Sequence, residues 1–281
     1  EATVDAIQRM VIADRRSRLK NGDTIISAFS RNDMEREEGA RTPEHNAVLQ
    51  AGAKHDVYTI TGFVGAGKDA QVYRAETLES RIVALKMFNR EVPKSRIMNE
   101  YKVGTAIHCP YVAEYYSIGH WSNDRYFIAL EYVAGRSLRE MIDQEERPDK
   151  TTFRAIAVCL MEAIRAFHLH ERDGKVRPLL HSDIKPENIL LPEKDKAVLI
   201  DLGIAGEPRV DIFAGTAGYV PPDSMDGTDM QFSESVDLFA LGVTLWEWLF
   251  GAKPYQSATI GDTPDMPEHI DEEMRQYLPW L

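Results

Sequence analysis

The chain has 281 residues, of which 43% are hydrophobic and 28% charged, and its formal net charge is −12 at pH 7. This length and composition predict a globular protein with enough apolar residues for one large domain or for two lobes that share a cleft. The acidic balance disfavours general affinity for nucleic acid phosphates, and no apolar run is long enough to cross a bilayer. We therefore expect neither a nucleic acid partner nor a membrane span.

Both cysteines, Cys109 and Cys159, stand in apolar surroundings without metal-ligand spacing. This pattern predicts two packed thiols in a reducing compartment, and hence a cytoplasmic location. The chain begins with Glu1 rather than Met and ends at Leu281, directly after an aromatic, proline-containing stretch. We therefore expect a piece of a longer protein with further domains beside it.

Residues 1–56 are polar and of mixed charge. Within them, Val4, Ile7, Met10 and Val11 follow helical spacing, which predicts one amphipathic helix. We interpret this segment as an N-terminal extension, partly helical, with a regulatory role.

After the extension, short β-branched and aromatic runs occur at 57–64, 71–75, 82–87 and 126–132. They predict the strands of an antiparallel sheet, and the helical spacing within 95–107 predicts one helix that crosses it.

Beyond Gly135 the pattern becomes helical. An apolar stripe at helical spacing comprises Phe153, Ile156, Leu160, Ile164 and Phe167. The sequence therefore predicts an α+β fold of two lobes, a small antiparallel β lobe with one main helix and a larger α-helical lobe, with a ligand cleft between them.

The first candidate site is the glycine-rich stretch 65–70, which lies between two predicted strands. Gly65 and Gly67 would let a hairpin lie close over phosphate groups and offer backbone N–H donors. The same region matches most of a Walker A pattern, with residues 197–201 as a Walker B strand. Against a P-loop NTPase, Asp69 stands where a magnesium-binding hydroxyl should be, and the sequence that follows is strand-like rather than helical.

The second candidate is Lys86, which ends an apolar strand. A lysine in this position needs an anionic partner because its ammonium is costly to desolvate alone. Glu100 on the predicted helix would supply that partner while Lys86 contacts the α- and β-phosphates of a nucleotide.

The third and fourth candidates are the stretch His181-Ser182-Asp183-Ile184-Lys185-Pro186-Glu187-Asn188 and the triplet Asp201-Leu202-Gly203 after an apolar strand. In such a loop Asp183 would orient a hydroxyl, Lys185 would neutralise a moving phosphoryl group, and Asn188 would bind magnesium. Asp201 would hold a magnesium ion that bridges the β- and γ-phosphates.

In this order, the four elements resemble the catalytic domain of the eukaryotic-type (Hanks-type) Ser/Thr protein kinase family, over about residues 57–281. The resemblance implies a bilobal fold with a five-stranded N-lobe at about 57–133 and a C-lobe at about 134–281. It also implies ATP and Mg²⁺, Asp183 as catalytic base, Lys86 paired with Glu100, and Asn188 and Asp201 as metal ligands.

By the same resemblance, Leu130 is the gatekeeper and Glu131 to Val133 the hinge. The residues expected around adenine are Val64, Val72, Ala84 and Leu190. Residues 215–223 resemble the end of the activation segment, and 237–242 the start of the central C-lobe helix. Asp223 replaces the usual glutamate of this segment, and we expect its partner arginine to lie beyond Leu281. The resemblance therefore implies a C-lobe that is incomplete at its C-terminal end.

Some positions depart from the family pattern. Ala70 replaces the third glycine of the loop, and Leu202 replaces the phenylalanine of the D-F-G element, both changes that activity should survive. Ser182 replaces the arginine that would bind a phosphorylated activation loop, and residues 204–214 contain no Ser, Thr or Tyr. We therefore expect activity that is constitutive or controlled by the extension, a flanking domain or a homodimer.

Lys185, and Thr216 in the segment that should face the substrate, are typical of the Ser/Thr branch of the family. The sequence thus predicts ATP-dependent phosphorylation of serine or threonine in proteins, including autophosphorylation. Two alternatives are a pseudokinase, which binds nucleotide without catalysis, and a small-molecule kinase of the aminoglycoside or choline type.

Overall fold

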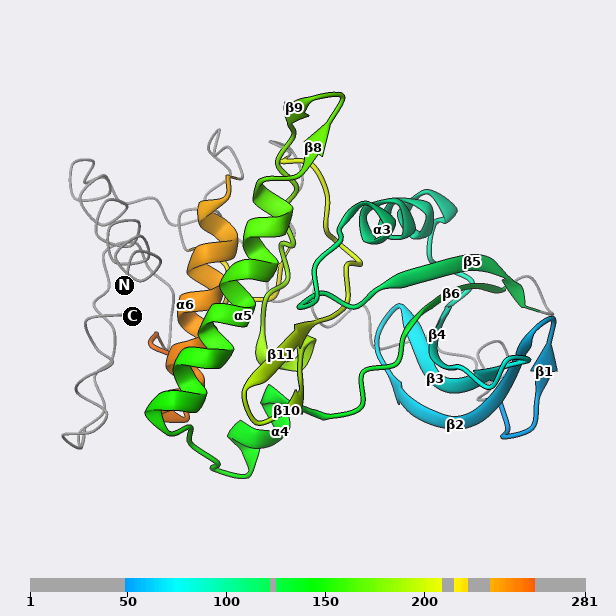
Figure 1. Cartoon of the computed structure of the whole chain (residues 1–281), viewed down its shortest axis with the longest axis horizontal. Helices are drawn as coiled ribbons and strands as arrows, with labels where there is room; N and C mark the ends of the chain where they lie inside the picture. Colours follow the sequence, from blue (N-terminus) through cyan, green and yellow to red (C-terminus); the bar gives the residue numbers. More distant parts are fainter. Residues whose placement is uncertain (1–48, 122–124, 209–214, 222–232, 256–281) are drawn as a thin grey trace, which may run out of the picture.

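The computed structural model describes residues 49–121, 125–208, 215–221 and 233–255. Almost all of the predicted N-terminal extension, including its expected helix at 4–11, lies outside these residues, as do Asp223 and most of 204–214. The remainder forms a curled sheet with one helix, followed in the chain by a mainly helical part (Figure 1).

The first part is built on a six-stranded antiparallel sheet. Its strands are β1 (Lys54–His55), β2 (Tyr58–Ala66), β3 (Ala70–Thr77), β4 (Ile82–Phe88), β5 (Tyr115–Trp121) and β6 (Arg125–Glu131), in the spatial order β1-β2-β3-β4-β6-β5. All four predicted runs form strands. The sequence pattern missed the two strands at the sheet edges, β1 and β5, and the sheet has one strand more than the five that the resemblance implied.

Successive side chains along these strands point to opposite faces of the sheet, so the sheet has one apolar cluster on each face. Tyr73, Leu85 and Met87 belong to a cluster enclosed by the curled sheet. On the other face, register pairs Val72 with Lys86 and Ala84 with Leu130, so these four side chains point the same way. That face joins the larger core, which extends into the helical part.

Helix α3 (Lys94–Ala106) covers this second face and is the helix predicted at 95–107. It begins after Pro93, whose fixed φ suits the start of a helix, and it packs against β5 and β6. Its buried residues include a carboxylate, Glu100, and a glycine, Gly104.

The helical part contains α4 (Leu138–Asp143), α5 (Lys150–His168) and α6 (Ser235–Phe250). Ser137 and Glu140 form a capping box at α4, and Asp149 caps α5 by accepting a hydrogen bond from the N–H of Thr152. The predicted apolar stripe of α5 is buried along its whole length. Helix α6 is buried on nearly all sides, and it begins close to the predicted position 237–242.

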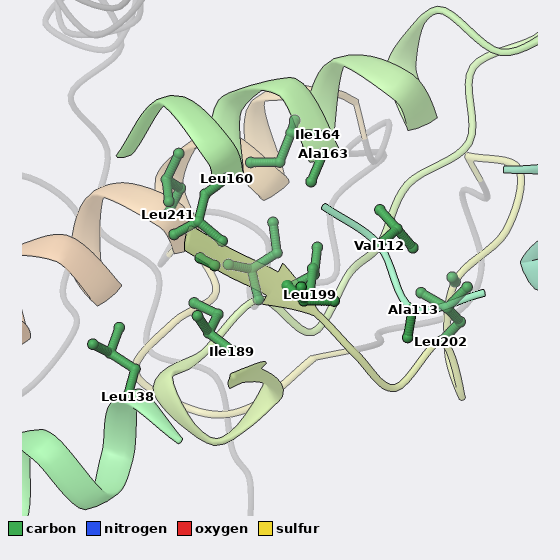
Figure 2. Packing of buried hydrophobic residues seen from close by; sticks show 14 of the residues in the cluster. Val112, Ala113, Leu138, Leu160, Ala163, Ile164, Ile189, Leu199, Leu202 and Leu241 are labelled. Carbon is green, nitrogen blue, oxygen red and sulfur yellow. The ribbon is translucent and has the colours of Figure 1, made fainter. Parts of the chain in front are cut away.

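A three-stranded sheet of β7 (Arg136–Ser137), β10 (Ile189–Glu193) and β11 (Lys196–Leu199) and the 3-10 turn η1 (Pro186–Asn188) adjoin the third and fourth candidate sites. The hairpin of β8 (Glu171–Arg172) and β9 (Lys175–Val176) lies apart from them, beyond the end of α5 (Figure 1). Figure 2 shows how the core runs from Leu160 and Leu241 on the helices, past Leu199 on β11, to Leu202.

These elements decide one alternative that the sequence left open. A strand, β3, follows the glycine-rich stretch, so the helix N-terminus that a P-loop requires is absent there and the Walker interpretation is wrong. Among the described residues, no helix combines the length and the apolar composition that a bilayer crossing requires.

Candidate functional site

Lys86, Glu100 and Asp201 meet where the sheet, α3 and the helical part adjoin. The ammonium of Lys86 donates to Oε1 of Glu100 and to Oδ1 of Asp201, both at 2.6 Å. The side chains of Lys86 and Glu100 are 12% and 2% exposed, so this pair has little access to water, whereas the side chain of Asp201 is 43% exposed. The contact between Lys86 and Asp201 joins residues 115 positions apart in the chain.

The carboxylates control the protonation of this cluster. Burial opposes the charge on Lys86, but Glu100 and Asp201 outweigh it and raise the pKa of the ammonium above its ordinary value. Burial likewise opposes the charge on Asp201, but Lys86 lowers the pKa of that carboxyl below its ordinary value. Lys86 and Asp201 are therefore ionised throughout the physiological pH range.

Asp183 lies in a second cluster, formed by the loop between Leu180 and η1. Its Oδ1 accepts a hydrogen bond from the hydroxyl of Thr216 at 2.6 Å, and its Oδ2 lies 2.8 Å from Nζ of Lys185. Nζ of Lys185 also donates to the Thr216 hydroxyl at 2.8 Å. A carboxylate, a cation and a hydroxyl are thus arranged in a closed triangle.

Asn188 connects the two clusters. Its Nδ2 donates to the backbone carbonyl of Asp183 at 2.8 Å and to Oδ2 of Asp183 at 3.1 Å. The backbone carbonyl of Asn188 accepts a hydrogen bond from the N–H of Ile200 at 2.9 Å, and Ile189 pairs with Leu199 in the β10–β11 hairpin. This pairing brings the end of η1 next to the residue that precedes Asp201.

Asp237, in the first turn of α6, holds the backbone of the Asp183 loop. Its fully buried carboxylate accepts hydrogen bonds from the N–H groups of His181 (3.0 Å) and Ser182 (2.8 Å) and pairs with Nε2 of His168 (2.9 Å). Ser182 adopts a left-handed backbone, with φ of 66°. Such a conformation is unfavourable for a residue with a side chain, and the two hydrogen bonds that the backbone N–H groups donate to Asp237 help to hold the loop in it.

The donor set suits a magnesium ion. Asn188 and Asp201 offer one amide oxygen and one carboxylate, the hard oxygen ligands that Mg²⁺ prefers, and Mg²⁺ usually takes few protein ligands and fills its shell with water and phosphate oxygens. Within the described ranges there is no cluster of three or more His, Cys, Asp or Glu side chains that would form an all-protein metal site. The two residues therefore fit a metal that arrives with a phosphate-bearing ligand.

The glycine-rich stretch is tied to the end of β4 and to α3. Asn89 donates from its backbone to the carbonyl of Asp69 and from its side chain to the carbonyl of Lys68, both at 2.8 Å. The Asp69 carboxylate lies 2.7 Å from Nη2 of Arg96. The carboxylate that argued against a triphosphate site is thus neutralised by a neighbouring cation.

The residues expected around adenine are distributed unequally. Val72, Ala84 and the expected gatekeeper Leu130 share the Lys86 face of the sheet, and Glu131 ends β6 with its N–H bound to the carbonyl of Glu114 at 2.7 Å. Leu190 lies on β10, where it pairs with Val198 of β11 and Ser137 of β7. Val64, on β2, is 53% exposed. Gly65 pairs with Val72, which places the loop beside the same face, and the N–H of Gly67 donates to the carbonyl of Ala70 at 2.8 Å. Val133, two residues after the end of β6, is half-buried.

Sequence reasoning missed several residues that support the site. Asp237 had a usable signal, because it is an acid at the start of an otherwise apolar helix. Tyr115, Arg96 and Arg139 had none, because their partners lie far away in the chain. Arg139 donates to Glu187, Glu247 and Tyr219 (2.8, 2.9 and 2.9 Å) and so ties α4 to η1 and α6.

Comparison with known proteins finds relatives that are named as protein kinases. The serine/threonine-protein kinase PknD of Mycobacterium tuberculosis is 29% identical over 229 residues, which are 76% of this chain and 33% of that protein. Mitogen-activated protein kinase kinase 1c of Physcomitrium patens is 29% identical over 204 residues, 69% of this chain and 56% of that protein. Aurora kinase C of Mus musculus is 27% identical over 236 residues, 79% of this chain and 82% of that protein.

The chain thus spans between a third and about half of the length of the first two of these relatives. The family model described as "Protein kinase domain" matches residues 58–277, most of the chain. Because this match includes both side-chain clusters, the chain belongs to the protein kinase domain family.

Proposed function

We propose that this chain transfers the γ-phosphoryl group of Mg-ATP to serine or threonine hydroxyls of proteins. The observation that carries the proposal is the closed triangle of Asp183, Lys185 and Thr216, linked through Asn188 to the Lys86–Asp201 contact. A hydroxyl acceptor, a base and two cations are all needed for phosphoryl transfer, and this arrangement supplies the base and the cations.

In the proposed reaction, Asp183 accepts a hydrogen bond from the substrate hydroxyl where it now accepts one from Thr216. The substrate oxygen forms a bond to the γ-phosphorus while the bond from that phosphorus to the β–γ bridging oxygen breaks. The hydroxyl proton passes to Asp183, and ADP leaves with the bridging oxygen. Lys185 lies 2.8 Å from Oδ2 of Asp183, so its ammonium would stabilise the charge on the moving phosphoryl group.

The nucleotide would take the place between the two clusters. Lys86, positioned by Glu100, would contact the α- and β-phosphates, while Gly65 and Gly67 leave room for the phosphates beneath the loop. Asn188 and Asp201 would hold Mg²⁺, which when bound neutralises the β- and γ-phosphate oxygens. Adenine would lie against Val72, Ala84 and Leu190, with Val64 above it and the backbone of Glu131 and Val133 at its edge.

We also propose domain limits, means of control and a location for this chain. We place the kinase domain at 57–281 and regard 1–56 as a regulatory extension, with flanking domains or a homodimer as further means of control. We also propose a cytoplasmic location and a role in intracellular signalling. The thiols of Cys109 and Cys159 are free, which supports a reducing compartment.

The test is incubation of the chain with labelled ATP, magnesium and either generic basic proteins or a panel of small alcohols. We expect label on serine and threonine of the proteins and of the chain itself. Asp183→Asn should lower kcat about 10²- to 10⁴-fold while ATP binding stays within about twofold, because general base catalysis contributes that much.

Asp195→Asn, in the exposed turn between β10 and β11, is the matched control and should behave like the parent. Label on small alcohols alone would identify a small-molecule kinase. Nucleotide binding without transfer to any acceptor, equal in parent and Asp183→Asn, would identify a pseudokinase.

A further inference from the structure

Gly104 leaves a space in the buried face of α3 that is filled from another element. A Cβ atom at this position would lie 2.4 to 2.6 Å from Cγ, Cδ1 and Cδ2 of Tyr115. Atoms do not approach so closely, so the ring of Tyr115, at the start of β5, rests directly on the helix backbone. Glycine at 104 is therefore what allows an aromatic ring to enter between α3 and the rest of the site.

The ring carries its hydroxyl to the centre of the Lys86 cluster. The phenol donates to Oε1 of Glu100 at 3.2 Å, the same oxygen that accepts from Lys86, and it accepts from the N–H of Leu202 at 3.4 Å. Tyr115 is 6% exposed and Leu202 fully buried. Burial and the nearby carboxylates raise the pKa of the phenol well above its ordinary value, so it keeps the proton that it donates to Glu100.

We propose that Tyr115, admitted by Gly104, is a positioning residue that locks Glu100 and the Asp201-Leu202-Gly203 backbone into the arrangement needed for phosphoryl transfer. Its hydroxyl touches neither nucleotide nor acceptor and acts through Glu100 on Lys86 and through Leu202 on Asp201.

Two further contacts support a lock at this junction. Arg96 and Asn99, both on α3, donate to the carbonyls of Gly203 (3.3 Å) and Ala205 (2.9 Å). Together with Tyr115 they satisfy three backbone groups within four residues of the segment after Asp201.

The catalytic effect rests on the proposed function, whereas the lock itself is testable without activity. Tyr115→Phe removes one oxygen and keeps the ring against Gly104. Tyr101→Phe is the matched control, because Tyr101 lies on α3 itself and its phenol makes one long bond, 3.5 Å, to the carbonyl of Tyr116.

Hydrogen–deuterium exchange should become faster in Tyr115→Phe for peptides that cover 94–106 and 199–206, and remain unchanged in Tyr101→Phe. The kcat should fall about tenfold, because one hydrogen bond to a charged group is lost. The KM for the protein substrate should stay the same, since the acceptor binds beside Asp183 and Thr216.

Gly104→Ala should give the same local exchange pattern by displacing the ring. Parental exchange in Tyr115→Phe would overturn the proposal, and so would exchange that rises throughout the chain, which would mean a merely structural role. If the parent transferred no phosphate but exchange rose only at these two segments, the proposed function would fail and the lock would stand.

Discussion

Asp237→Asn offers a demanding check on how the Asp183 loop is held. The carboxylate accepts two backbone N–H groups and pairs with His168, at 2.8 to 3.0 Å, without exposure to water. Asparagine keeps one acceptor oxygen but turns an NH₂ group toward at least one of these donors. That donor then loses its partner in a buried site.

The expected cost follows from these contacts. A buried donor left without an acceptor costs about 1–3 kcal/mol, and the remaining bonds lose the benefit of a charged acceptor, so the total should be about 2–4 kcal/mol. This is a large fraction of the 5–15 kcal/mol that is typical of folded proteins. Because Ser182 then relaxes from its left-handed conformation, Asp183 should move, and a displacement of about 1 Å can cost roughly 10²-fold in rate.

The assay combines urea unfolding, followed by fluorescence and circular dichroism, with steady-state kinetics at saturating ATP. We expect a clearly lower unfolding midpoint and a kcat reduced about 10- to 100-fold. Asp173→Asn, at the exposed tip of the β8–β9 hairpin, should leave both values unchanged. An Asp237→Asn variant with the midpoint and kcat of the parent would refute our account of the loop.

Two weaker interactions give contrasting predictions. His181 is buried with Nδ1 accepting from the N–H of Asp183, and burial lowers its pKa below the ordinary 6.5, so the unfolded chain binds the proton more readily. The free energy of unfolding should therefore fall as pH drops below 6.5, with a contribution from His181 of up to about 1.4 kcal/mol per pH unit. Urea midpoints of His181→Asn should depend less steeply on pH than those of the parent, and an equal slope would contradict this. The side chains of the Asp69–Arg96 ion pair are 33% and 41% exposed, so Asp69→Asn should lower the thermal unfolding midpoint by no more than about 3 °C. A drop beyond about 5 °C would show that this pair stabilises the fold more than exposed ion pairs do.

The local pattern of the sequence determined the strands from Tyr58 to Phe88, helices α3 and α5, and the residues of both side-chain clusters. Strand and helix periods are set by neighbours along the chain, and the loop at 181–188 concentrates charge between apolar flanks, which few structural roles require. The edge strand β5 escaped this reasoning because it is only half-buried, so its alternation of apolar and polar residues is weak.

Only the tertiary structure decided which groups meet. Tyr115 reaches Leu202 across 87 positions, and Asp237 reaches Ser182 across 55. Such contacts depend on how the sheet, α3 and α6 pack, because a side chain's partner is fixed by the three-dimensional arrangement of elements and leaves no period in the sequence. Gly104 shows the difference most directly, since a glycine within a helix looks like a weakness until the ring that occupies its place is seen.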